Sequence, residues 1–163
     1  MNHHNTMYDI MFQNFFLLFF GPGMDWKWMK AQAIAESALN PQAVSPVGAM
    51  GIMQIMPPTW EEIREALNLA DEPFIPHLNI KAGIYYNKRL YRVWKAETGI
   101  ERLRFTFASY NAGLGNIIKA QRLAEQSDIW ASLALVLPRV TGRHAVETVN
   151  YIKRIEQIYR EEL

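Results

Sequence analysis

The feature that most limits how this chain can fold is an irregular stretch set between segments with helical periodicity. In residues 31–60, AQAIAESALNPQAVSPVGAMGIMQIMPPTW, an apolar approach gives way to Asn, Pro, Ser and Gly residues that form turns. On both sides of this stretch, apolar side chains recur at three- and four-residue intervals, which is typical of amphipathic helices. We therefore predict an all-α protein with one long, ordered loop.

A single carboxylate marks the start of this loop. Glu36 is the only ionisable side chain in residues 31–60, and it follows a run from Ala31 to Ala35 that is apolar except for Gln32. Such a carboxylate either faces a cleft or is neutralised by desolvation, and the plain alternative is an exposed Glu at a helix end. Burial among apolar groups raises the pKa of a carboxylic acid enough for it to donate a proton at neutral pH. No second carboxylate is obvious in the loop.

Four short motifs follow one another along the chain, and they resemble those of the lytic transglycosylases. These are peptidoglycan-cleaving enzymes with a fold similar to goose-type lysozyme. The resemblance covers about Asp25 to Tyr159. It rests on Glu36-Ser37, on Ser45-Pro46-Val47-Gly48-Ala49 with Gly51-Ile52-Met53-Gln54, on Ser109-Tyr110-Asn111-Ala112-Gly113, and on Glu147-Thr148-Val149-Asn150-Tyr151.

The resemblance implies a role for each of the motif residues. Glu36 is expected to act as the catalytic acid and then as the base, and Tyr151 to hold it by a hydrogen bond. Ser37 is expected to bond backbone. Core packing stays open as an alternative for Tyr110, Met56 and Tyr151, and Glu147 is the best candidate for a second carboxylate. The implied substrate-binding residues are Ser45, Gln54, Met56, Tyr110, Asn111 and Glu147, and the glycines expected to allow close backbone approach are Gly48, Gly51 and Gly113.

Three positions differ from the usual family pattern. Ala35 stands where Gln often precedes the catalytic Glu, Ser109 stands where Ala precedes the Tyr, and Trp60 replaces a residue that is usually small. None of these differences removes a reacting group, so they bear on substrate fit more than on activity.

Turn signals divide the remaining sequence into helices of one domain, residues 1–163, with an N-terminal helix and break at 1–23 and a catalytic core at 24–163. The resemblance adds a lysozyme-like architecture with the cleft at the end of the second helix. The expected signals are a cap at Asp25, a capping box from Thr59 to Glu62, a long helix closing near Gly99, a stop at Gly113 and Gly115, a break at Pro138 and Gly142, and a last helix from about His144.

The apolar run Phe15–Phe20 is too short to cross a bilayer. No Lys or Arg precedes it and no small-residue cleavage site follows, so we do not expect a signal peptide. The run is expected to pack on the domain, or to contact a membrane or a protein partner. A cell-wall enzyme acts outside the cytoplasm, in the periplasm or cell wall, or is delivered by a phage.

Charge and composition restrict the partners. The formal net charge is +1, and residues 81–104 hold seven Lys or Arg against two Glu. That basic segment suits a solvated helix face better than an anionic polymer, and no nucleic-acid partner is expected. The chain has no Cys, and His144-Ala-Val-Glu147 is only half of a metal motif. Neither a metal nor an organic cofactor is expected, and the predicted state is a monomer.

The predicted function is lytic cleavage of the β-1,4 bond between N-acetylmuramic acid and N-acetylglucosamine, giving 1,6-anhydromuramyl products. The resemblance implies this chemistry, and a site with one acid fits it. Two alternatives remain open: a hydrolytic, lysozyme-like muramidase on the same fold, and a catalytically weak domain that only binds peptidoglycan.

Overall fold

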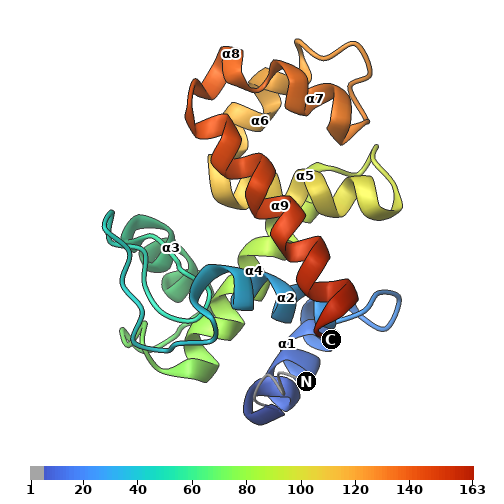
Figure 1. The fold of residues 1–163 in the computed structure, drawn as a ribbon. Coiled ribbons are helices and arrows are strands. Elements are labelled where there is room, and N and C mark those ends of the chain that lie inside the picture. Colours follow the sequence, from blue (N-terminus) through green and yellow to red (C-terminus); the bar gives the residue numbers. More distant parts are fainter. Residues whose placement is uncertain (1–5) are drawn as a thin grey trace. The chain divides into compact units, whose positions relative to one another are not determined.

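The computed structural model describes residues 6–163, which fold almost entirely into helices (Figure 1). Within this range there is no β-strand, and residues 44–55 hold only isolated bridges, Val44 to Met50 and Met50 to Ile55. The prediction of an all-α fold is confirmed. After a short 3-10 turn at Thr6–Tyr8, the helices are α1 Asp9–Phe20, α2 Lys27–Ser37, α3 Pro57–Leu67, α4 Pro76–Val93, α5 Gly99–Ala112, α6 Leu114–Gln121, α7 Trp130–Val136, α8 Pro138–Thr141 and α9 His144–Glu161.

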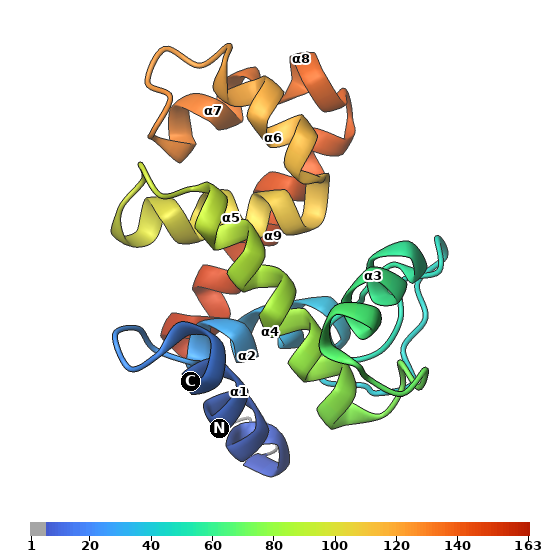
Figure 2. The same cartoon turned by 180° about the vertical axis from the view of Figure 1, so that it is seen from behind.

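The chain divides into two compact units. Unit 1 comprises Met1–Tyr86 and Ile155–Leu163, and unit 2 comprises Asn87–Arg154. Two long helices, α4 and α9, give residues to both units. The ribbon of α9 can be followed without interruption in Figure 1 and that of α4 in Figure 2. The prediction of a single domain stays a prediction.

Unit 1 is built on the packing of α1 against α2. Phe12 and Phe16 of α1 are buried, and so is the middle of α2 from Met29 to Ile34. A charged side chain lies inside this interface: Lys30, whose side chain is only 3% exposed, pairs with Asp9 of α1. Because a buried ammonium is costly without a partner, this ion pair ties α1 to α2.

The last turns of α9 close unit 1 over the start of α2. The rings of Trp28 and Tyr159 stack with their centroids 3.7 Å apart. The Tyr159 hydroxyl donates to Asp25 Oδ2 at 3.0 Å, while Asp25 Oδ1 accepts the Lys27 N–H at 3.0 Å. The predicted N-cap at Asp25 is wrong, because α2 begins at Lys27 and Trp26 is its N-cap residue. The Asp25 carboxylate nevertheless accepts the first N–H of the helix and holds the C-terminal helix.

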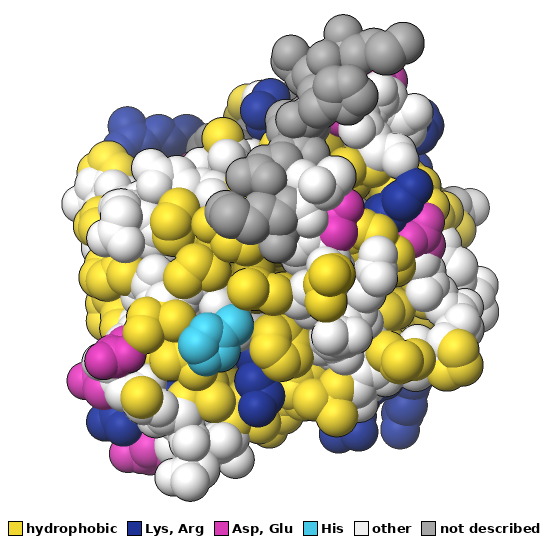
Figure 3. Space-filling view, turned by 90° about the horizontal axis from the view of Figure 1, so that it is seen from below, with side chains coloured by type: hydrophobic (Ala, Val, Ile, Leu, Met, Phe, Trp, Pro, Cys, Tyr) yellow, Lys and Arg dark blue, Asp and Glu magenta, His cyan; other side chains and the backbone are white. Residues whose placement is uncertain are grey.

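The apolar run of α1 is only partly covered. Phe16 is buried and stacks on Phe20 with ring centroids 4.7 Å apart, and Phe19 packs edge-on against Tyr85. Leu17 and Leu18 remain 58% and 64% exposed. Hydrophobic side chains cover a broad part of the face seen in Figure 3. None of the helices formed by the described residues has the length and apolar character needed to span a membrane.

Unit 2 is organised around α5. Leu103, Phe105 and Phe107 are buried, and Phe105 packs edge-on against the indole of Trp94. Glu101 joins α5 to α7, because one carboxylate oxygen accepts the backbone N–H of Trp130 at 2.6 Å. A carboxylate at the first residue of a helix satisfies an N–H group that the helix itself leaves unpaired.

Several predicted helix boundaries are wrong. The Thr59–Glu62 capping box is absent, because α3 begins at Pro57 and Met56 is its N-cap residue. The long helix does not close near Gly99, since α4 ends at Val93 and Gly99 opens α5 with a φ of 52°. Gly113 does end α5, but Gly115 lies within α6. The break predicted at Pro138 and Gly142 is confirmed, because α7 ends at Val136, α8 begins at Pro138 and Gly142 ends α8.

Candidate active site

Glu36 is the penultimate residue of α2 and is half-buried. The helix stops just after it because Ala38 and Leu39 both adopt left-handed backbone angles, with φ of 53° and 62°. Ala38 N–H then donates to Ile34 O at 2.9 Å, which is a common way of ending a helix. This ending turns the chain sharply away from the carboxylate and into the loop of residues 40–56.

The loop beside Glu36 is ordered by its own short-range hydrogen bonds. Ser45 Oγ accepts the Ala49 N–H at 3.0 Å, and the Ser45 N–H donates to Ala49 O at 3.0 Å. Ser37 Oγ donates to Ile52 O at 2.8 Å, which is the kind of backbone bond expected of it. The serines of the first two motifs therefore hold the loop in shape.

Asn79, a buried residue of α4, fastens the loop to the helix. Its Oδ1 accepts the Met53 N–H at 2.7 Å, and its Nδ2 donates to Met50 O at 3.0 Å and to Pro73 O at 2.8 Å. A Cβ at Gly51 would lie 2.5 Å from Asn79 Nδ2 and 2.9 Å from Pro73 O, so only glycine fits there. We refer to these bonds as the Asn79 clasp. In the sequence, Asn79-Ile80 fits the family pattern between the second and third motifs, but nothing there indicated that Asn79 holds the loop.

Of the three glycines predicted to allow close backbone approach, Gly51 is the one packed tightly against other atoms of the protein. A Cβ at Gly48 would meet no atom within 4 Å, and at Gly113 the nearest atom would be 3.9 Å away. Both have positive φ, 91° and 89°. Glycine there supplies a backbone conformation that other residues rarely adopt, and close approach at these two positions stays a prediction.

Gln54 uses its amide nitrogen within the loop. Its Nε2 donates to Gly51 O at 2.9 Å and to Ala43 O at 3.2 Å, and its backbone is left-handed with a φ of 49°. A non-glycine residue in this region is uncommon and is often found at functional sites. The amide oxygen is then the group that Gln54 can offer to a ligand.

Met56 follows at the end of the loop and is 40% exposed. The alternative in which Met56 is a plain core residue is therefore wrong. Val44 and Val47 in the same loop are 62% and 76% exposed, so the loop that leads away from Glu36 carries a set of apolar side chains at its surface.

Unit 2 contains a polar pocket of about 260 Å³ at the start of α9. Two predicted substrate-binding residues, Asn111 and Glu147, line it together with Ala112, Asn116, Thr141, His144 and Thr148. Asn111 Oδ1 accepts the hydroxyl proton of Thr148 at 2.8 Å. Glu147 is 69% exposed and its Oε2 lies 3.9 Å from His144 Nδ1. The third and fourth motifs therefore meet in this pocket.

The two tyrosines of these motifs, Tyr110 and Tyr151, are half-buried. Glu36 belongs to unit 1 and Tyr151 to unit 2. The hydrogen bond expected between the two side chains therefore remains a prediction.

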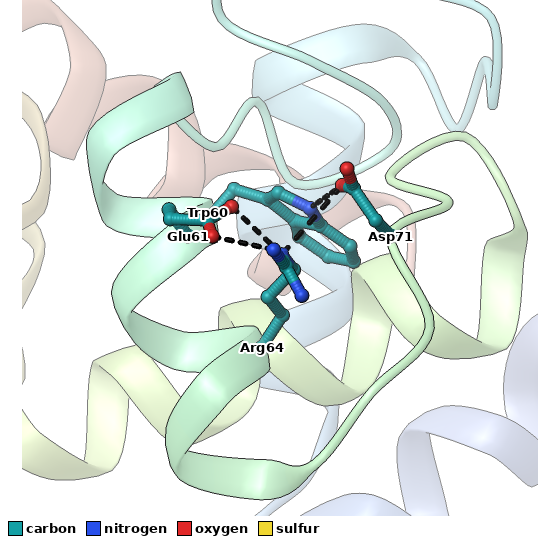
Figure 4. A network of polar contacts seen from close by, with 4 residues as sticks. All are labelled: Trp60, Glu61, Arg64 and Asp71. Carbon is teal, nitrogen blue, oxygen red and sulfur yellow. Dashed lines mark hydrogen bonds and ion pairs between the residues drawn. The ribbon is translucent and has the colours of Figure 1, made fainter.

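At two of the positions that differ from the usual family pattern, the unusual side chain has a hydrogen-bond partner inside the protein. The hydroxyl of Ser109, which is fully buried, accepts the Trp94 indole N–H at 2.9 Å and donates to Phe105 O at 2.7 Å. The Trp60 indole N–H donates to Asp71 Oδ1 at 2.9 Å (Figure 4). In each case the unusual residue brings a polar atom into the interior together with a hydrogen bond that satisfies it.

Figure 4 shows how this network fixes the chain that follows α3. Arg64 Nε donates to Glu61 Oε2 at 2.7 Å, and the same nitrogen lies 3.8 Å from Asp71 Oδ1. Asp71 thus meets both Trp60 and Arg64, and the segment between α3 and α4 is held against α3. Its end, Pro73, is one of the partners of the Asn79 clasp.

Across the part of the chain that the structure describes, no three His, Asp or Glu side chains come together in a way that could hold a metal ion. The polar groups around the loop and in the pocket are one carboxylate in each place, amides, hydroxyls and, in the pocket, the imidazole of His144. Such a set can transfer a proton and hydrogen-bond a neutral, polar ligand.

Comparison with known proteins places this arrangement in a family. The family described as the transglycosylase SLT domain matches residues 21–133, a segment that includes Glu36, the loop and Asn111. Together with the helical fold, this match defines the class as a domain of the lytic transglycosylase type. The chain belongs to the transglycosylase SLT domain family.

Curated relatives and solved structures agree with this assignment. The chain is 36% identical over 132 residues to a membrane-bound lytic murein transglycosylase F of Maricaulis maris, covering 78% of this chain and 28% of that protein. It is 33% identical over 137 residues to a protein of the same name from Shewanella pealeana, covering 81% and 28%. The 70 kDa soluble lytic transglycosylase SLT70 of Escherichia coli superposes with a TM-score of 0.76 at 26% identity, covering 96% of this chain and 24% of that one. The chain thus spans less than a third of the length of these proteins.

Proposed function

We propose that this chain is a peptidoglycan lytic transglycosylase domain that cleaves the β-1,4 bond between N-acetylmuramic acid and N-acetylglucosamine without water. The observation that carries the proposal is Glu36, the single carboxylate of residues 31–60, at the end of α2 beside an ordered loop. Membership of the SLT family and the names of the curated relatives support the substrate class.

The proposed reaction needs one group that gives a proton and takes one back. Glu36 in its acid form donates its proton to the glycosidic oxygen, and the bond from that oxygen to C1 of the muramyl residue breaks as an oxocarbenium-like centre develops. The glutamate, now a carboxylate, accepts the proton of the muramyl 6-hydroxyl while that oxygen forms its bond to C1. The products are a free 4-hydroxyl on the leaving sugar and a 1,6-anhydro ring, and Glu36 ends protonated as it began.

The other site residues would position the glycan strand. Gln54 would accept a hydrogen bond through its amide oxygen, because its amide nitrogen is used by the loop. Exposed Met56 would supply an apolar surface, and Ser45 would keep the loop in the shape that surrounds Glu36. Asn111 and Glu147 would bind a further part of the strand in the unit 2 pocket, and Tyr151 would orient Glu36. No step requires a metal or a cofactor.

The test is digestion of purified peptidoglycan by wild type and Glu36→Gln, with mass spectrometry of the released muropeptides. Gln keeps the size of the side chain but carries no transferable proton, and general acid–base assistance contributes roughly 10²- to 10⁴-fold. Because one residue acts in both steps, we expect turnover to fall at least about a thousandfold. Glu65→Gln, which changes an exposed glutamate of α3, is the matched control and should keep full activity.

The masses of the products separate the alternatives. Anhydro products are lighter than hydrolysed ones by one water, so hydrolysed products would identify a muramidase. Absence of any soluble product from wild type would identify a binding domain. Anhydro products from Glu36→Gln within tenfold of wild type would mean that another residue is the acid, and Glu147 would be the next to test.

With this substrate, the domain would act outside the cytoplasm, in the periplasm or cell wall, or would be delivered by a phage. The curated relatives are named membrane-bound, and we propose that the exposed Leu17 and Leu18 of α1 contact a membrane or a protein partner. Sedimentation with lipid vesicles, comparing wild type with the double variant Leu17→Ser and Leu18→Ser, tests the membrane contact. Equal sedimentation of the two proteins would argue against it. The domain is proposed to act as a monomer.

A further inference from the structure

We propose that the unit 2 pocket at the start of α9 is a subsite for a secondary amide, and that Thr148 is the positioning residue that fixes how Asn111 presents its side chain there. The inference rests on the proposed function for its substrate class, because peptidoglycan carries secondary amides in its N-acetyl groups and in its stem peptides. The geometry of three side chains leads to it.

The first two side chains, Thr148 and Asn111, form a hydrogen-bonded pair. The two ends of an Asn amide have nearly the same shape, so neighbouring groups decide which end faces a ligand. Thr148 is 1% exposed, and its hydroxyl donates to Asn111 Oδ1 at 2.8 Å. Its other acceptor, His144 O, is more distant at 3.4 Å. The Asn111 oxygen is therefore occupied, and its Nδ2 is left as a donor on the pocket wall.

The third side chain, Asn116 of α6, is held in the opposite sense. Its Nδ2 donates to Ala112 O at 2.8 Å, so its Oδ1 is left as an acceptor. Asn111 and Asn116 line the same pocket. One thus offers an N–H and the other an oxygen, which is the complement of the C=O and N–H groups of a secondary amide.

Charge at the pocket agrees with a neutral ligand. Glu147 and His144 are the titratable side chains among the lining residues; both are 69% exposed, and Glu147 Oε2 lies 3.9 Å from His144 Nδ1. A carboxylate disfavours an anionic ligand but accepts a hydrogen bond from an amide N–H. The pocket volume of about 260 Å³ is ample for an acetamido group or one peptide unit.

The experiment compares Thr148→Val with wild type in steady-state kinetics. Val keeps the volume of the buried side chain but has no hydroxyl, so the Asn111 amide is free to turn over. We expect KM to rise about five- to tenfold, the equivalent of one hydrogen bond, with kcat within about twofold. Thr148→Ser restores the hydroxyl and should bring KM back to within about twofold of wild type.

Thr106→Val is the matched control. Thr106 is also a fully buried threonine of unit 2, and its hydroxyl donates to the carbonyl of Arg102, four residues earlier, at 2.8 Å. It does not line the pocket. A loss of stability alone would therefore appear in both Val variants, whereas the rise in KM should appear only in Thr148→Val.

Two substrates distinguish the source of the amide. On glycan strands stripped of stem peptides, a retained KM effect identifies the sugar N-acetyl group. An effect seen on intact peptidoglycan but lost on stripped strands identifies a stem-peptide amide. An unchanged KM on both, or a fall in kcat alone, would overturn the subsite.

The subsite can be tested even if the proposed enzymatic function is wrong. If wild type releases no product, calorimetric titration with N-acetylglucosamine oligosaccharides and intact soluble muropeptides decides the subsite by binding alone. A Kd weakened about five- to tenfold by Thr148→Val would support it, and an unchanged Kd would overturn it. Should Thr148→Val fail to fold, Asn116→Ala removes the acceptor oxygen and is held to the same criteria.

Discussion

Replacing Asn79 by Ala should destabilise the protein and impair its activity together. The side chain is 1% exposed and makes three hydrogen bonds, to Met53 N–H, Met50 O and Pro73 O, so the substitution leaves one donor and two acceptors in the interior without their partner. Met50 and Met53 belong to the loop that carries Gln54 and Met56, and Pro73 belongs to the segment between α3 and α4. Loss of the clasp therefore reaches the site directly.

The magnitude follows from the number of bonds. At about 1 kcal/mol for each lost hydrogen bond, Asn79→Ala should lower the free energy of unfolding by about 3 kcal/mol. For a chain of this size that corresponds to a fall in melting temperature of roughly 6–12 °C. We expect the rate of muropeptide release to fall by at least about tenfold at temperatures where the variant is still folded, since small displacements of catalytic groups are costly.

Asn79→Asp tests the same three hydrogen bonds in a second way. The carboxylate would keep the acceptor for Met53 but would face the Met50 and Pro73 carbonyl oxygens without a proton to donate. Burial and these oxygens should raise the pKa of the introduced carboxyl above the roughly 3.9 of a free Asp. A raised folded-state pKa means that the variant is most stable, relative to wild type, below that value and loses this stability as pH rises through the folded pKa.

Chemical denaturation followed by circular dichroism measures these changes. Asn14→Ala, at an exposed position on α1, is the matched control and should stay within about 0.5 kcal/mol of wild type. Asn79→Ala within that same margin, or with unchanged activity despite the expected destabilisation, would refute the role given to the clasp.

Three further predictions concern the reacting acid, Glu36, and two tyrosines of α9, Tyr151 and Tyr159. Activity should fall on the alkaline side with an apparent pKa of about 5.5–7, because Glu36 must begin protonated, and a flat profile between about pH 4 and about pH 9 would contradict this. Tyr151→Phe should reduce kcat less than Glu36→Gln does, since it disturbs the orientation of the acid without removing its proton, and an equal loss in both variants would assign the tyrosine a larger part. Partial burial, together with the hydrogen bond to Asp25, raises the pKa of Tyr159. The folded protein then holds the phenol proton more tightly than the unfolded chain does, so the stability that Tyr159 contributes is complete below about pH 10 and is lost as pH rises through the folded pKa. Tyr159→Phe should therefore lower the free energy of unfolding by about 1 kcal/mol at neutral pH. In denaturation curves above about pH 10, the difference from wild type should be smaller.

Local patterns in the sequence were sufficient for the helices and for the position of Glu36. Helical spacing and the glycine and proline breaks predicted α1, α2 and α9 near their observed bounds, because amphipathic spacing and chain breaks are local properties. The same patterns failed where two local signals compete. Thr59 and Glu62 have the spacing of a capping box, but Pro57 and Pro58 already have the φ of a first helical turn, so the N-cap residue is Met56, three residues before Thr59.

The supports of the site could not be predicted in this way. The bonds from Asn79 to Met53 and Met50 join residues that are 26 and 29 positions apart, and no short pattern encodes such pairs. The hydrogen bond from Thr148 to Asn111 joins residues that are 37 positions apart. Motif resemblance named Asn111 but gave no reason for its orientation, which depends on the packing of α9 against α5.

The ion pair between Lys30 and Asp9 affects how a shorter version of this domain could be made. Gly21-Pro22-Gly23 looks like a natural place to cut, and the family match also begins at residue 21. Cutting there would remove Asp9 and leave the ammonium of Lys30, 3% exposed, without its counter-charge, while the apolar surface beneath Phe12 and Phe16 would face water. Breaking a buried ion pair from one side costs about 3–5 kcal/mol, a large part of the stability of a typical domain. A truncation that ends at this break would need Lys30 replaced by an apolar residue of similar length, such as Met.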